Sequence, residues 1–167
     1  MIRTHRIFSI ILLTFIIAGC ASSSSIEVAS GVTISSNLSI DDIKVSNKSG
    51  ETFDGTNVEA MMKAAIEEQV TQNKLRLFSE ARDSHLLEID IIQYSKGSAV
   101  KRWLLPGAGK TVLSVEATLK TPSGQIIAES QATESIGAGG LYTIGAWKKV
   151  FNKVAKSLVK DIKELVS

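Results

Sequence analysis

Two runs of alternating apolar and polar residues, separated by a Pro–Ser–Gly turn, constrain the fold of this chain more than any other feature. The apolar members of the first run, residues 110–121, share one side of an extended chain: Leu113, Val115, Ala117 and Leu119. Residues 125–135 return after the turn, which proline and glycine favour. The pair predicts an antiparallel hairpin with one buried face and one solvated face.

The rest of the chain adds strands and two long helices to this hairpin. Residues 38–45, 76–79 and 85–95 predict further strands. Residues 56–75 and 143–167 instead repeat apolar side chains every three or four positions, which predicts two amphipathic helices. We therefore expect an α+β domain in which a largely antiparallel sheet of four or five strands carries both helices on one face.

Residues 1–19 have the organisation of a signal peptide. A start with two arginines precedes an apolar run at 7–17, which is shorter than the roughly 20 residues of a membrane-spanning helix. The motif that follows resembles the lipobox of bacterial lipoproteins: Ile17, Ala18, Gly19 and Cys20. The resemblance implies that the signal is removed and that Cys20 carries a diacylglycerol thioether and an N-linked fatty acid such as palmitate. An unmodified cysteine behind an ordinary signal is the alternative.

The segment after the lipobox bears on where the domain is held. Residues 20–37 contain four consecutive serines at 22–25, which predict a flexible tether between the lipid and a single domain at 38–167. Ala21, not aspartate, follows the cysteine, which resembles the sorting pattern of enterobacterial outer-membrane lipoproteins. The expected location is therefore the outer membrane, with the domain facing the periplasm.

Charge and cysteine content exclude several classes of function. The chain has 19 basic and 17 acidic residues, and loss of Arg3 and Arg6 with the signal leaves 17 of each. A mature chain without excess charge predicts no general attraction to nucleic acid. The single cysteine allows neither an intramolecular disulfide nor a zinc site of clustered cysteines.

The motif "GAGKT" at 107–111 resembles the end of a phosphate-binding loop. That loop needs a further glycine five residues before Gly109, where this chain has Leu104. Lys110 also opens a predicted strand, whereas a phosphate loop opens a helix whose N-terminus holds the anion. We therefore expect no nucleotide binding, and a turn here with Leu104 and Leu105 packed under the sheet.

Residues that could carry chemistry are sparse. His85 is the only histidine outside the predicted signal. Asp41 and Asp42, like Glu67 and Glu68, are paired carboxylates without a second acidic cluster, so solvated side chains are expected. The sequence predicts no catalytic residue, metal or cofactor. An enzyme whose residues converge only in the fold, around Asp41, Asp42 or His85, is the alternative.

The terminal helix carries six lysines against Asp161 and Glu164. Lys149, Lys153 and Lys156 are candidates for contact with anionic lipid or lipopolysaccharide. A solvated helix face is the alternative.

Several of these motifs together point to a family. The lipobox, "RWLLPGAGKTVLSVEATL", "TPSGQIIAES", "GAGG" and the terminal helix resemble DUF4410-type bacterial lipoproteins, a family of unknown function. The resemblance covers roughly residues 38–165 and implies a fold and an envelope location, but no catalytic residue. The expected function is a non-enzymatic binding or assembly module anchored through Cys20. A subunit of a larger envelope or secretion complex is the alternative.

Overall fold

A computed structural model describes most of the predicted domain. The described residues are 22–34, 38–51, 55–75, 84–105, 108–137 and 145–166. Predicted features outside them are the signal peptide at 1–19, the lipobox residues Ile17, Ala18, Gly19 and Cys20, and the strand at 76–79. Within the described ranges, no helix is both long enough and apolar enough to cross a bilayer.

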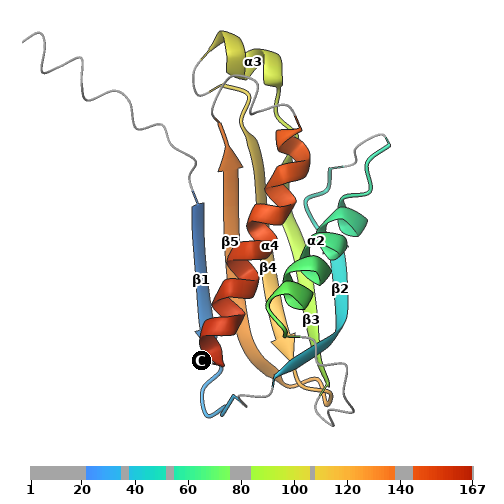
Figure 1. The fold of residues 1–167 in the computed structure, drawn as a ribbon, viewed down its shortest axis with the longest axis vertical. Coiled ribbons are helices and arrows are strands. Elements are labelled where there is room, and N and C mark those ends of the chain that lie inside the picture. Colours follow the sequence, from blue (N-terminus) through green and yellow to red (C-terminus); the bar gives the residue numbers. More distant parts are fainter. Residues whose placement is uncertain are drawn as a thin grey trace, which may run out of the picture.

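The described part of the chain forms a five-stranded sheet in the order β1-β5-β4-β3-β2 (Figure 1). The strands are β1 (Ser22–Val28), β2 (Ser39–Asn47), β3 (Ser84–Ser95), β4 (Thr111–Lys120) and β5 (Ile126–Ile136). Strands β2 and β3 are parallel, and the other neighbouring pairs are antiparallel. The predicted hairpin is β4–β5, and the predicted α+β class with a largely antiparallel sheet is confirmed.

Two helices cover one face of this sheet, α2 (Val58–Gln72) and α4 (Ala146–Leu165) (Figure 1). Asn57 caps α2, because its side-chain oxygen accepts a hydrogen bond from the Ala60 amide at 2.7 Å. The apolar stripes of both helices pack on alternate strand residues and form one core with them. Both predicted helices are therefore present, and the helix side of the sheet is filled by apolar side chains.

The serine-rich segment differs from its prediction. The flexible tether expected at residues 20–37 is wrong over Ser22–Val28, because this segment is strand β1 and pairs with β5 along its whole length. An edge strand is held by backbone hydrogen bonds, which serine forms as well as an apolar residue does. Two of the serine hydroxyls also donate hydrogen bonds to carboxylates of the domain.

The chain between β3 and β4 also differs from its prediction. It forms the short helix α3 (Ala99–Leu104), which projects beyond one end of the sheet (Figure 1). Leu104 and Leu105 do not pack under the sheet, since they are 60% and 62% exposed. The Ser98 amide donates to the Gly109 carbonyl at 2.9 Å, so the excursion closes on itself at its base and its tip stays outside the core.

Candidate functional site: a polar sheet face and a buried acidic seam

The residues that the sequence singles out for a possible enzyme site, His85, Asp41 and Asp42, lie on the neighbouring strands β3 and β2, near the start of each. His85 is the second residue of β3 and is buried, and its Nδ1 lies 3.2 Å from the backbone carbonyl oxygen of Ser39. The Asp41 side chain accepts a hydrogen bond from the Ser39 hydroxyl at 2.9 Å, and Asp42 is exposed, 4.0 Å from Lys44. Among the residues that the structure describes, no three His, Cys, Asp or Glu side chains could share a metal ion.

The face of the sheet opposite the helices carries mainly polar side chains and is called the polar face here. It is formed by the strand residues that alternate with the buried ones, among them Ser25, Glu27, Asp42, Lys44, Glu88, Asp90, Glu116, Thr118, Lys120, Glu129 and Gln131. The predicted polar side of residues 110–121 is part of this face. With the helices on the other side, the polar face is the one large surface of the described sheet that is left open.

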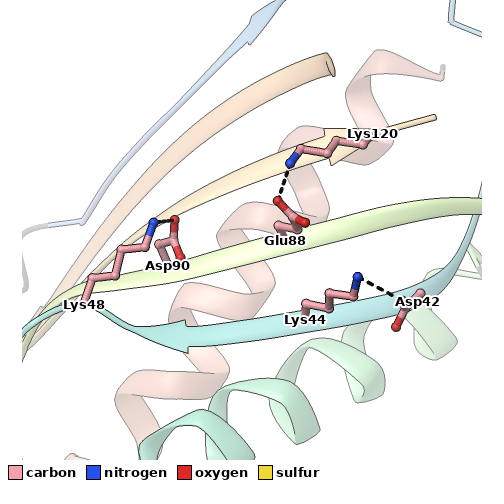
Figure 2. A network of polar contacts seen from close by, with 6 residues as sticks. All are labelled: Asp42, Lys44, Lys48, Glu88, Asp90 and Lys120. Atoms are coloured by element: carbon pink, nitrogen blue, oxygen red, sulfur yellow. Dashed lines mark hydrogen bonds and ion pairs between the residues drawn. The ribbon is translucent and has the colours of Figure 1, made fainter. Parts of the chain in front are cut away.

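Three ion pairs lie on the polar face over β2, β3 and β4, one within β2 and two between segments (Figure 2). The Lys48 ammonium lies 2.6 Å from the Asp90 carboxylate, and Lys120 contacts Glu88. The hydrogen bond to Asp90 and its negative charge raise the pKa of Lys48 above its ordinary value. Ion pairs on a protein surface contribute little to stability, so these three mainly set the charge pattern of the polar face.

A shallow hollow of about 280 Å³ lies on the polar face towards β1. Four carboxylates line it, from Glu27, Asp90, Glu116 and Glu129. Glu27 is directly opposite Glu129 on the neighbouring strand, and Asp90 is opposite Glu116. Like charges in directly opposed positions destabilise a sheet. The Lys48 ammonium offsets the negative charge of Asp90, and the Gln131 side-chain amide donates a hydrogen bond to the Glu116 carboxylate at 3.1 Å.

Two further carboxylates lie on the helix side of the sheet, in what we call the acidic seam: Glu134 of β5 and Asp161 of α4. They are only 5% and 8% exposed. Glu134 accepts hydrogen bonds from Ser22 at 2.5 Å and from Ser157 at 3.0 Å, and Asp161 accepts one from Ser24 at 3.3 Å. The second oxygen of Asp161, Oδ2, is buried without a hydrogen-bond partner in the described part of the chain. Hydroxyls from β1 are therefore a main source of donors for the seam.

Sequence reasoning missed the acidic seam. Glu134 stands in the helix-facing register of β5, between Ala132 and Ile136, and this break in the alternation is a signal that could have been followed. Asp161 takes a buried position of helix α4, next to the buried Ile162. Neither signal indicates the serines as partners, because Ser22 is 112 residues from Glu134 in the sequence.

The serine–carboxylate contacts lead to a prediction about β1. Changing Ser22 and Ser24 together to alanine should weaken the docking of β1 by about 2 kcal/mol, because buried acceptors would lose donors. The measurement is amide hydrogen exchange across Ser22–Val28. Ser23 and Ser25 point to the polar face and are the matched control, with an expected change within about 0.5 kcal/mol. Equal exchange in both double variants would show that the hydroxyls do not hold the strand.

The lysines singled out on the terminal helix are all solvent-facing. Lys149, Lys153 and Lys156 are exposed along α4, on the side away from the core. Nearer the C-terminus, Lys160 pairs with Glu164 at 3.5 Å, an exposed i,i+4 contact. Exposed lysines at these positions are consistent with solvation and with contact to an anionic surface. The lipid contact of these lysines therefore stays a prediction.

The family profile described as "Domain of unknown function (DUF4410)" matches residues 21–140, which is more than half of the chain. The chain belongs to the DUF4410 family. The family predicted from the sequence is confirmed, but the bounds differ from the expected 38–165. The DUF4410 match begins at Ala21, so it includes β1, and it ends before α4.

Solved structures share the fold of this DUF4410 protein at low sequence identity. The PelC dodecamer from Paraburkholderia phytofirmans is 13% identical, with a TM-score of 0.52, over 83% of this chain and 96% of that one. Protein XCC0632 from Xanthomonas campestris is 11% identical, with a TM-score of 0.51, over 77% and 86%. No curated protein matches this sequence. At these identities the likeness shows a common fold and carries no residue roles.

Proposed function

We propose that this DUF4410 protein is a non-enzymatic binding or assembly module of the bacterial envelope. It is anchored to the outer membrane by acylated Cys20, and its domain faces the periplasm. The observation that carries the proposal is the contrast between the two sides of the sheet. One side is a filled apolar core under α2 and α4, and the other is an open polar face with a shallow hollow.

The shape of the polar face favours a partner surface over an enclosed substrate. Sites for small molecules are concave and mostly apolar, and they bury most of the ligand. The hollow instead is lined mainly by polar and acidic side chains that come from four neighbouring strands. A broad surface of fixed side chains with a defined charge pattern is suited to recognition of another envelope protein.

The anchor is tested by changing Cys20 to serine. We expect no lipid on the variant and retention of residues 1–19, because a lipoprotein signal peptidase acts on the lipid-modified cysteine. Mass spectrometry of the N-terminal peptide, with metabolic labelling by a palmitate analogue, reads both outcomes. A wild-type chain that is cleaved elsewhere and lacks an acyl group would overturn the anchoring.

A matched variant tests the location separately. Changing Ala21 to aspartate leaves Cys20 in place, so lipid attachment should persist. In an enterobacterial host the variant should move from the outer-membrane to the inner-membrane fraction. An unchanged distribution would refute the proposed sorting while leaving the lipid anchor intact.

A role as one subunit of a larger envelope assembly is the second candidate. PelC, which shares the fold, is described as a dodecamer. In the described sheet, β1 and β2 are edge strands, and edge strands offer unpaired backbone groups to a neighbour. The mass of the lipidated protein in mild detergent decides between the two, since a monomer would exclude self-assembly and a discrete oligomer would support it.

A further inference from the structure

The tip of α3 exposes apolar side chains that no part of the described chain covers. Val100 is 65% exposed, and Leu104 and Leu105 are 60% and 62% exposed. These three residues, called the apolar tip here, come from one short helix and the residue after it. Clusters of exposed large apolar residues on a small domain mark contact sites for proteins or membranes.

The register of the sheet places the apolar tip at the end where β1, the first strand after the predicted lipid anchor, begins. β3 ends and β4 begins next to each other, with Ser95 opposite Val112, and α3 lies in the connection between them. β5 also ends at this end of the sheet, since Ile136 is opposite Thr111. β1 begins at this end too, with Ser22 opposite Glu134, and Ser22 is two residues after Cys20 in the sequence (Figure 1).

The charge around the apolar tip matches an anionic surface. Residues 91–115, which include α3, contain no aspartate or glutamate. Lys101 and Lys110 are exposed beside the tip. Lys96, directly after β3, and Lys148, at the start of α4, are also exposed, and both ammonium groups lie within 5 Å of the Trp147 ring centroid. Apolar side chains bordered by lysines are typical of segments that lie in the interface of a bilayer.

The base of the excursion is built to hold the apolar tip in place. The Ser98 amide donates to the Gly109 carbonyl at 2.9 Å, and the Thr111 hydroxyl donates to the Lys96 carbonyl at 2.8 Å. Gly97 and Gly109 both have positive φ, and added Cβ atoms there would meet backbone atoms across the base. These hydrogen bonds and close backbone contacts close the base of the excursion and fix the position of the apolar tip relative to the sheet.

We infer that the apolar tip inserts into the surface of the membrane that holds Cys20, as a second and non-covalent contact that orients the domain. The inference rests on the proposed anchoring for the identity of the partner. Insertion of Val100, Leu104 and Leu105 would leave Lys101 and Lys110 at the level of the phosphates. The polar face and its hollow would then stand at a fixed orientation to the bilayer, available to a partner.

The experiment places a thiol at the apolar tip of the full-length protein. Leu104→Cys and, independently, Val100→Cys are labelled with an environment-sensitive fluorophore after reconstitution into phosphatidylethanolamine–phosphatidylglycerol vesicles. Ile126→Cys is the matched control, because Ile126 is also partly exposed, at 40%, but begins β5 at the opposite end of the sheet. Nitroxide-labelled lipid should quench most of the fluorescence at 104 and 100 and little at 126, and aqueous iodide should do the reverse.

The outcomes separate this inference from the proposed anchor. Equal quenching by lipid at 104 and 126 overturns the inference. Protection of position 104 from iodide that rises with protein concentration, without quenching by lipid, also overturns it, because it would indicate a second copy of the chain on the tip. Mass spectrometry of the same samples reads acylation of Cys20 and identifies the labelled peptide. Acylated Cys20 without lipid quenching at 104 contradicts only the insertion of the apolar tip. Lipid quenching at 104 without acylation contradicts only the proposed lipid anchor.

Discussion

Replacing Phe151 by alanine is expected to remove about 3 to 5 kcal/mol from the free energy of unfolding. Phe151 is 1% exposed on the inner side of α4, and its ring centroid lies 5.2 Å from that of Tyr94 on β3. The shortened side chain would leave a cavity between helix and sheet that rigid neighbours fill only in part. A domain of this size has a total stability of about 5 to 15 kcal/mol, so the loss is a large share.

A hydrogen bond holds the Tyr94 side chain in place, so it cannot move far into the cavity left by Phe151→Ala. Its hydroxyl donates to the Trp147 carbonyl at 3.2 Å, and burial raises the pKa of Tyr94 to about 12, which keeps the hydroxyl protonated. Urea denaturation of a form that begins at Ala21 gives the free energy. Asn152→Ala is the control, because Asn152 is adjacent but exposed, and its loss should stay within about 0.5 kcal/mol. A Phe151→Ala loss below about 1 kcal/mol would contradict the packing described for α4.

Changing Gly97 to alanine is expected to cost about 3 kcal/mol, in the upper part of the range for single substitutions. Gly97 has a φ of +65°, a conformation that costs other residues roughly 1 to 2 kcal/mol. The added Cβ would also meet the backbone carbonyl oxygens of Lys110 and Gly109, the latter at 2.5 Å. Backbone atoms cannot move aside as a flexible side chain can, so the base of the α3 excursion would have to open.

Gly124→Ala separates the two contributions to this loss. Gly124, in the turn between β4 and β5, has a φ of +87°, but an added Cβ would meet nothing within 4 Å. Its loss should therefore reflect conformation alone, at about 1 to 2 kcal/mol. Denaturation compares the two variants, and hydrogen exchange at the Ser98 amide reports opening of the base. Equal losses at both glycines would mean that the close approach at Gly97 has no energetic weight.

The elements predicted correctly are those whose pattern is local. Residues 110–121 and 125–135 form their hairpin because the alternation and the turn lie within one short stretch, and contacts inside a hairpin need little help from elsewhere. Phe151 and Leu158 lie on the apolar stripe of α4 for the same reason, since helical spacing selects one face. The family assignment also rests on such contiguous motifs.

The failures share the opposite property, because they depend on residues far apart in the chain. The four serines have no apolar side chain to bury. Ser22–Val28 forms a strand because its backbone pairs with the edge of β5 and because Glu134 accepts a hydrogen bond from Ser22. Leu104 and Leu105 have the hydrophobicity of core residues, but the Ser98–Gly109 contact closes the excursion and holds them outside.

The amino-acid pattern alone was sufficient for the α+β class, the hairpin, the two helices and the family, because backbone periodicity and turn chemistry act over a few residues. The packed chain was needed to bring Glu27 and Asp90 to one hollow, to bury Asp161 behind β1, and to set the apolar tip at the end of the sheet where β1 begins. Those placements follow from strand order and long-range register, which depend on how all the apolar faces are buried together and leave no mark in any short stretch of sequence.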